Sequence, residues 1–124
     1  MIAVVDDDAS VCRSIQRLLR AAEMEAETFG SGKDFFDRME TVASFRPDCV
    51  VLDVHMPVMG GLEVQKRIAA FAVRVPVIFI TAHDEEKLRD QALKSGAIAF
   101  LHKPFDDHLF IRTVEEALKK GSIE

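Results

Sequence analysis

Hydrophobic residues gather in short, nearly unbroken runs that are separated by stretches of mixed polarity. Four runs rich in β-branched residues lie at positions 2–5, 49–52, 75–80 and 98–101. Unbroken apolar runs of this length are typical of parallel strands that helices cover on both faces. A weaker run at 26–29 alternates between apolar and polar positions, which favours a strand at the edge of the sheet. The pattern therefore predicts five strands.

Between these runs, hydrophobic residues recur at the spacing of one helix face. The residues that mark five helices are, in chain order, Val11, Ile15, Leu18 and Leu19; Phe35, Phe36 and Met39; Val64, Ile68 and Phe71; Leu88 and Ala92; Phe110, Val114, Ala117 and Leu118. Asp8 and Ser31 precede the first two helices, and their side-chain types predict N-caps. The fourth helix is expected to begin at 84–86 and to end at Gly96. Strands that alternate with helices in this way predict an α/β fold with right-handed crossovers.

Composition limits the class of protein. A length of 124 residues fits one compact domain over 1–124. The net charge of −5 and the lack of a basic block argue against direct nucleic-acid binding by this segment. No apolar run is long enough to span a membrane and the first residues do not resemble a secretory signal, so we expect a cytoplasmic protein. Cys12 and Cys49 are expected to be reduced core residues.

Polar residues follow the predicted strands at the points where the strands end. Asp6 and Asp7 follow the first strand, Asp53 the third, Thr81 the fourth and Lys103 the fifth. The carboxyl ends of parallel strands meet at one edge of a sheet, which is where open α/β sheets bind ligands. We therefore expect three carboxylates, one hydroxyl and one ammonium group to share a pocket.

Three carboxylates in one pocket repel one another. Two charges about 4 Å apart interact by ~4 kcal/mol at an effective dielectric constant of 20, and one lysine cannot offset three acids. Either a carboxylate takes up a proton or a divalent cation binds among them. Oxygen ligands without nearby His or Cys favour Mg²⁺, which commonly shares its ligand shell with phosphate. The sequence thus predicts a site for a metal ion and a phosphoryl group.

The motifs at these strand ends occur in a familiar order. They are Val5-Asp6-Asp7-Asp8, Val51-Leu52-Asp53, Met56-Pro57, Gly60-Gly61-Leu62, Ile80-Thr81-Ala82 and Lys103-Pro104-Phe105. Over its whole length the chain resembles the receiver domain of two-component response regulators, and it is most similar to the nitrogen-fixation regulator (FixJ-like) subgroup. The resemblance implies a flavodoxin-like (βα)5 three-layer sandwich whose parallel five-stranded sheet has the order 2-1-3-4-5.

The resemblance also implies roles for the metal ligands and the phosphoacceptor. Asp53 matches the aspartate that accepts a phosphoryl group from a kinase phosphohistidine. Asp7, Asp53 and the backbone carbonyl of His55 match the metal ligands, and Asp6 matches an acid that supports the metal through water. The expected ion is Mg²⁺, with Mn²⁺ as a substitute.

Other matched positions contact the phosphoryl group or transmit its arrival. Lys103, Thr81 and the backbone N–H of Ala82 match groups that contact the phosphoryl oxygens. Thr81 and Phe100 match the pair that couples phosphorylation to a change of surface. His55 and His83 occupy positions that tune the lifetime of the phosphoryl group. The Lys103–Pro104 peptide bond matches one that is often cis in the family.

The implied activity is a switch with Mg²⁺-dependent self-phosphorylation and autodephosphorylation, not a classical enzyme. The implied partner is a sensor histidine kinase. Phosphorylation is expected to favour a homodimer through the fourth helix, fifth strand and fifth helix. No output domain lies within residues 1–124, so a DNA-binding domain outside this segment and a free-standing receiver are both consistent with the sequence.

Two alternatives stay open at this point. Asp6, Asp8 and Ser10 fit the DxDx[ST] start of haloacid-dehalogenase-like phosphatases, in which Asp6 would be the nucleophile and Asp53 would have no catalytic role. The other alternative is a binding module that has lost phosphorylation. The receiver interpretation makes Asp53 the nucleophile, the phosphatase alternative makes Asp6 the nucleophile, and the binding-module alternative has no nucleophile.

Overall fold

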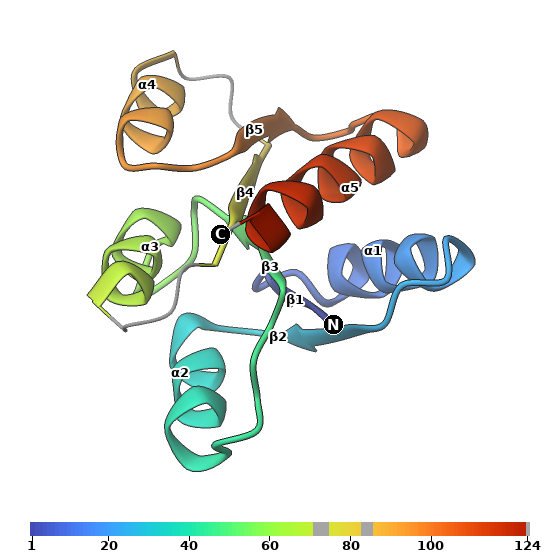
Figure 1. Cartoon of the computed structure of the whole chain (residues 1–124). Coiled ribbons are helices and arrows are strands. Elements are labelled where there is room, and N and C mark those ends of the chain that lie inside the picture. Colours follow the sequence, from blue (N-terminus) through green and yellow to red (C-terminus); the bar gives the residue numbers. More distant parts are fainter. Residues whose placement is uncertain (71–74, 83–85, 124) are drawn as a thin grey trace.

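Strands and helices alternate along the chain, as the hydrophobic pattern predicts (Figure 1). The computed structural model describes residues 1–70, 75–82 and 86–123. The strands are β1 (Ile2–Val5), β2 (Ala26–Phe29), β3 (Cys49–Asp53), β4 (Val77–Thr81) and β5 (Ala99–His102). The helices are α1 (Ala9–Ala21), α2 (Gly32–Thr41), α3 (Gly61–Ala70), α4 (Glu86–Lys94) and α5 (Asp107–Ile123).

All five strands are parallel and lie in the order β2-β1-β3-β4-β5, which confirms the predicted flavodoxin-like topology. β2 lies at an edge and is half-buried along most of its length, in agreement with its alternating pattern. β4 begins two residues later than the apolar run that predicts it. The run includes Pro76, which has no N–H to donate to a neighbouring strand.

Helices cover both faces of the sheet, with α1 and α5 on one face and α2, α3 and α4 on the other (Figure 1). Successive strand residues therefore enter different cores. In β1, Ala3 and Val5 pack with residues of α2 and α3, whereas Ile2 and Val4 pack with residues of α1 and α5. This two-sided burial explains why the strands read as unbroken apolar runs.

Both cysteines are free and buried, as predicted. The Cys49 side chain lies in β3 within the core shared with α1 and α5. Burial, together with the negative charge of Asp48, raises the pKa of the Cys49 thiol to about 12. The thiol is therefore neutral at physiological pH and acts as a small apolar group.

The predicted helix ends are also present where the structure describes them. The Asp8 side chain accepts hydrogen bonds from the backbone N–H groups of Ser10 and Val11, and Ser31 Oγ accepts one from Asp34. α4 ends at Lys94, and Gly96 takes a left-handed conformation (φ +99°). Residues 84 and 85 of the predicted helix start, and Phe71, which was predicted to belong to the third helix, lie outside the described residues.

In the described part of the chain, no helix is long and apolar enough to cross a membrane.

Candidate functional site at the carboxyl edge of the sheet

The fold brings the predicted polar residues to one edge. Asp6 and Asp7 follow β1 directly, Asp53 and Thr81 are the last residues of β3 and β4, and Lys103 follows β5. Parallel pairing places these strand ends side by side, with β3 between β1 and β4. The Lys103 backbone N–H donates to the Thr81 carbonyl (2.6 Å), which ties the segment after β5 to the end of β4.

The three carboxylates form a tight cluster. Asp6, Asp7 and Asp53 each offer a carboxylate oxygen, and these oxygens lie within 4.8 Å of one another. Asp6 is 1% exposed and Asp53 is 5% exposed, whereas Asp7 is exposed to solvent. Asp6 Oδ1 also accepts a hydrogen bond from the Asp8 backbone N–H (2.9 Å). Two of the three negative charges are thus removed from water, where their mutual repulsion is stronger.

Lys103 extends into this cluster. Its Nζ lies 2.9 Å from Asp6 Oδ2 and 3.6 Å from Asp53 Oδ1. Burial by itself lowers the pKa of Lys103, but the hydrogen bond to Asp6 and the charge of Asp53 outweigh burial and raise the pKa. Lys103 is therefore a fixed positive charge between two buried acids.

The surroundings of the Asp53 carboxyl disfavour its charged form. Burial, followed by the negative charge of Asp6, raises the pKa of Asp53 from 3.8 to about 6, although Lys103 opposes this shift. The carboxylate form still predominates at neutral pH. A further positive charge beside Asp53 would relieve the repulsion and lower its pKa.

The donor set fits a hard divalent cation. Three carboxylate oxygens converge without a histidine or cysteine ligand among them, and the exposed Asp7 leaves the cluster open to water. Oxygen-only sets of this kind suit Mg²⁺ or Mn²⁺ better than zinc.

The loop between Asp53 and α3 depends on a close backbone approach at Gly61. The Gly61 N–H donates to the Val54 carbonyl (2.9 Å), and a Cβ at Gly61 would lie 2.3 Å from the Asp53 carbonyl oxygen. Gly61 therefore holds the loop against the backbone of Asp53. In the sequence, Gly61 was singled out only by the resemblance to receiver domains. Its contact with the Asp53 backbone could not be predicted, because a contact across a loop leaves no periodic pattern of hydrophobic residues.

The remaining predicted residues surround the cluster at different depths. Thr81 is fully buried, Ala82 and His55 are exposed, and Phe100 is half-buried with its ring centroid 6.4 Å from that of Phe79. His83 lies outside the described residues. The Lys103–Pro104 peptide bond is cis.

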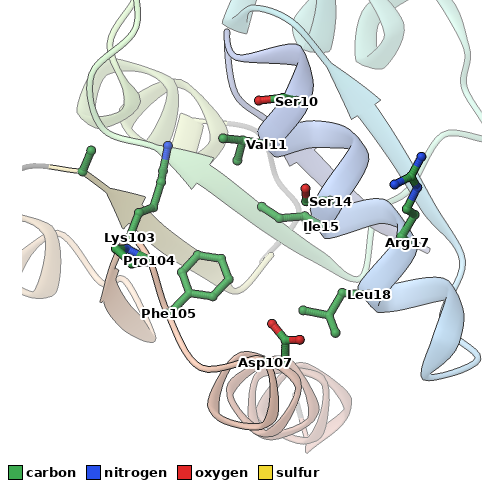
Figure 2. A pocket seen from close by; sticks show the side chains of 11 residues that line it. Ser10, Val11, Ser14, Ile15, Arg17, Leu18, Lys103, Pro104, Phe105 and Asp107 are labelled. Carbon is green, nitrogen blue, oxygen red and sulfur yellow. The ribbon is translucent and has the colours of Figure 1, made fainter.

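A groove that sequence reasoning missed runs from the cluster along α1 (Figure 2). Its volume is about 800 Å³, and Ala82 and Lys103 form its end nearest the carboxylates. Figure 2 shows Leu18 and Phe105 on opposite sides of the groove, with Arg17 and Asp107 near its far end. The groove is formed by α1 together with the segment between β5 and the first residue of α5, so neither part of the sequence predicts it alone.

The sequence matches the family described as the response regulator receiver domain over residues 2–115. This chain belongs to the response regulator receiver domain family. Receiver domains are signalling switches of two-component systems rather than classical enzymes, and sensor histidine kinases are their partners.

Individual receiver proteins show the same relationship. A crystal structure of a response regulator receiver protein from Burkholderia phymatum is 56% identical, covers 95% of this chain and 94% of that one, and superposes with a TM-score of 0.87. Nodulation protein W of Bradyrhizobium diazoefficiens is 37% identical over 97% of this chain and 52% of its own length. Transcriptional regulatory protein FixJ of the same organism is 36% identical over 97% of this chain and 57% of its own length, in agreement with the predicted subgroup. The chain thus spans about half the length of these two relatives.

Proposed function

We propose that residues 1–124 form one phosphoacceptor switch in which Asp53 receives a phosphoryl group from the phosphohistidine of a sensor kinase. One observation carries this proposal: the buried Asp53 carboxylate lies at the strand edge within 4.8 Å of two further carboxylates, with Lys103 Nζ 3.6 Å away. Negative and positive groups at this spacing suit the placement and charge neutralisation that phosphoryl transfer requires.

In the proposed reaction, an Asp53 carboxylate oxygen attacks phosphorus in line with the bond to the donor imidazole nitrogen. The new O–P bond forms as the N–P bond breaks, and the imidazole leaves with the bonding electron pair. A pKa of about 6 leaves most Asp53 side chains ionised at neutral pH, which suits a nucleophile. Later attack of water on the acyl phosphate would return Asp53 to its starting state.

Asp7, Asp53 and the His55 backbone carbonyl would hold Mg²⁺ or Mn²⁺, with Asp6 acting through water. The bound ion would supply positive charge to the phosphoryl oxygens and to the crowded carboxylates. Asp7 is well placed for this role because it is the exposed member of the cluster and can exchange water for an ion.

Lys103, Thr81 and Ala82 would receive the phosphoryl group. We propose that Lys103 Nζ transfers one of its contacts from Asp53 to a phosphoryl oxygen while it keeps the shorter contact with Asp6. The Thr81 hydroxyl and the Ala82 N–H follow β4 at the same edge and would donate to the remaining oxygens. His55 and His83 would tune the lifetime of the acyl phosphate.

Thr81 and Phe100 would transmit the change to the surface formed by α4, β5 and α5. Phe100 is half-buried and packs against the core that includes Phe79, so it has room to move inward if Thr81 shifts toward the phosphoryl group. We propose that this surface then favours a homodimer and so controls a DNA-binding output segment outside residues 1–124. Two facts about the FixJ relative support a DNA-binding output segment: the matched region is only 57% of its length, and it is called a transcriptional regulatory protein.

The test is the intact mass of the protein after incubation with Mg²⁺ and acetyl phosphate, measured beside Asp53→Ala and Asp6→Ala. A phosphoryl adduct that is lost in Asp53→Ala and merely reduced in Asp6→Ala supports the switch. An adduct that survives Asp53→Ala but not Asp6→Ala supports the phosphatase alternative. If no sample gains an adduct, the binding-module alternative is favoured and the proposed function fails.

A further inference from the structure

A polar side chain is buried where α3 meets the end of α4. Gln65 of α3 is only 5% exposed. Its Nε2 donates to the carbonyl of Ser95, the residue after α4 (3.2 Å), whereas its Oε1 is buried without a hydrogen-bond partner in the described chain. A buried acceptor that makes no hydrogen bond destabilises a fold, and such groups are rare enough in native proteins to require an explanation.

The bonded half of the amide completes the end of α4. The N–H groups of Gly96 and Ala97 donate to carbonyls in the last turn of the helix (both 3.1 Å), and Gly96 has a left-handed backbone, which together form a Schellman motif. These two bonds do not use the Ser95 carbonyl, which accepts from Gln65 instead. The end of α4 is therefore tied to α3 through the Gln65 side chain.

Few apolar side chains hold α4 in place. Among its described residues Ala92 alone is buried, Leu88 is half-buried and Leu93 is 42% exposed. By contrast, α1, α2 and α3 each bury three or more residues. Because a single alanine buries little apolar area, the interactions of Gln65 weigh heavily in the stability of the docked α4.

The helix that carries Gln65 is fixed against the backbone of Asp53. Gly61, at the start of α3, approaches the Asp53 carbonyl so closely that a Cβ there would lie 2.3 Å from the oxygen. Gln65 follows four residues later, on the same side of the helix. The next helix, α4, continues the chain beyond Thr81, the last residue of β4 at the same edge as Asp53. Gln65 thus joins a helix anchored at Asp53 to the helix that follows Thr81.

We propose that Gln65 is a positioning residue that keeps the contact between α3 and α4 weak, so that α4 can shift when Asp53 is phosphorylated. This inference rests on the proposed function, in which the surface formed by α4, β5 and α5 changes. The unpaired Oε1 raises the free energy of the docked arrangement, whereas a shift of α4 would let water or a neighbouring donor reach that oxygen. An apolar side chain in place of Gln65 would lose one hydrogen bond but would also remove this cost.

The test replaces the amide with apolar side chains of similar size. Gln65→Met and Gln65→Leu both remove the buried Oε1, and they release the carbonyl of Ser95, an exposed residue, to bind water. Gln16→Met is the matched control. Gln16 Nε2 likewise donates to a backbone carbonyl, that of Ala26 (3.1 Å), but Gln16 lies on α1, is half-buried and has no buried, unpaired oxygen.

Two quantities are measured without a phosphoryl group, namely the melting temperature and the hydrogen exchange of α4 backbone amides. We expect both Gln65 variants to melt roughly 4 °C higher than the wild type and to slow the exchange of α4 amides about fivefold, because the docked α4 becomes more stable than its opened forms. Gln16→Met should melt at or below the wild-type temperature and leave α4 exchange unchanged.

The third quantity is the affinity for beryllium fluoride in the presence of Mg²⁺, measured by ¹⁹F NMR. Beryllium fluoride is a non-covalent mimic of a phosphoryl group on a carboxylate. If its binding requires α4 to shift, a variant whose docked α4 is about fivefold more stable binds it about fivefold more weakly. We expect this loss in both Gln65 variants and wild-type affinity in Gln16→Met. A merely structural role for Gln65 would change the melting temperature without changing this affinity.

Lower or unchanged melting temperatures in both Gln65 variants would overturn the proposal, because Oε1 would then have a partner in solution, such as an internal water. Higher melting temperatures with unchanged affinity for beryllium fluoride would also overturn it, since the docking of α4 would not be coupled to Asp53. A wild type that does not bind beryllium fluoride overturns this inference alone if acetyl phosphate still gives a phosphoryl adduct. If acetyl phosphate gives no adduct either, the proposed function fails as well.

Discussion

The Lys103 ammonium group lies 2.9 Å from Asp6 Oδ2, although the two residues are 97 positions apart in the sequence. The Asp6 side chain is fully buried and that of Lys103 is 18% exposed, so water has little access to this ion pair. The same ammonium group lies 3.6 Å from Asp53. The Lys103 ammonium group therefore stabilises the negative charges of both Asp6 and Asp53 at this edge of the sheet.

Replacing Lys103 with Ala should destabilise the protein by about 3 kcal/mol at pH 7, because it leaves the buried Asp6 carboxylate without its cation. Urea unfolding of wild type and variant measures the change. Lys33→Ala is the matched control, since the Lys33–Asp37 pair is exposed on α2 and its loss should have little effect on stability. Equal costs for the two variants would show that the buried pair contributes no more than a surface pair.

Stability without metal should depend on pH through Asp53. The folded pKa of about 6 exceeds the ordinary value of 3.8, so between these values the folded state binds more protons than the unfolded state. Stability should therefore fall as pH rises from about 4 to 6, by up to ~3 kcal/mol from this group, and then change little. The Asp8 carboxyl has the opposite effect on stability, because hydrogen bonds from Ser10 and Val11 lower its pKa. Its contribution to stability is therefore lost as the pH falls.

The contribution of Asp53 is isolated by the difference between wild type and Asp53→Asn in EDTA buffers. We expect Asn at this position to remove the pH-dependent fall and to raise the stability at pH 7. Parallel pH profiles for the two proteins would exclude the raised pKa.

Adding Mg²⁺ should stabilise the fold, because the ion binds the folded cluster and relieves its repulsion. At ten times the dissociation constant the gain is about 1.4 kcal/mol, or roughly 5 °C in melting temperature. A thermal-shift titration with MgCl2 measures this gain. Asp7→Asn should lose most of the response with little cost to the fold, since Asp7 is exposed. A melting temperature that stays constant over a millimolar range would contradict a metal site.

Gly61→Ala should destabilise the protein by about 3 kcal/mol, because the new methyl group would lie 2.3 Å from the Asp53 carbonyl oxygen. Gly30→Ala offers a matched comparison, since a Cβ at Gly30 meets nothing within 4 Å. Urea midpoints of the two variants test the difference. A Gly61→Ala protein as stable as Gly30→Ala would mean that the loop base shifts freely away from Asp53.

The sequence predicted the fold closely because one physical signal dominates it. Residues of β1 and β3 are buried on both faces, and this leaves apolar runs that cannot belong to an amphipathic strand. The edge position of β2 followed from its alternation. The start of β4 was predicted two residues too early, because Pro76 continues the apolar run but has no N–H to donate to a neighbouring strand.

The site was predicted as a set of residues, but its internal contacts were not. Asp6 was expected to support a metal through water, and nothing in the sequence indicated its short contact with Lys103. That contact depends on the relative placement of β1 and the segment after β5, which local patterns do not encode. The left-handed backbone at Val58 was also unpredictable, because valine is among the residues least suited to it.

The sheet separates two hydrophobic cores that share strands but no side chains, since each strand residue faces one side. A change of volume at Leu19 of α1 can be accommodated by neighbours such as Phe110 or Val114, whereas Phe35 of α2 lies beyond the sheet. Compensating substitutions should therefore arise within one side. Over evolution, the side of the sheet covered by α1 and α5 can therefore change its packing while the side covered by α2, α3 and α4 keeps its own. The carboxyl ends of the strands belong to both sides, so the acidic cluster there can stay the same.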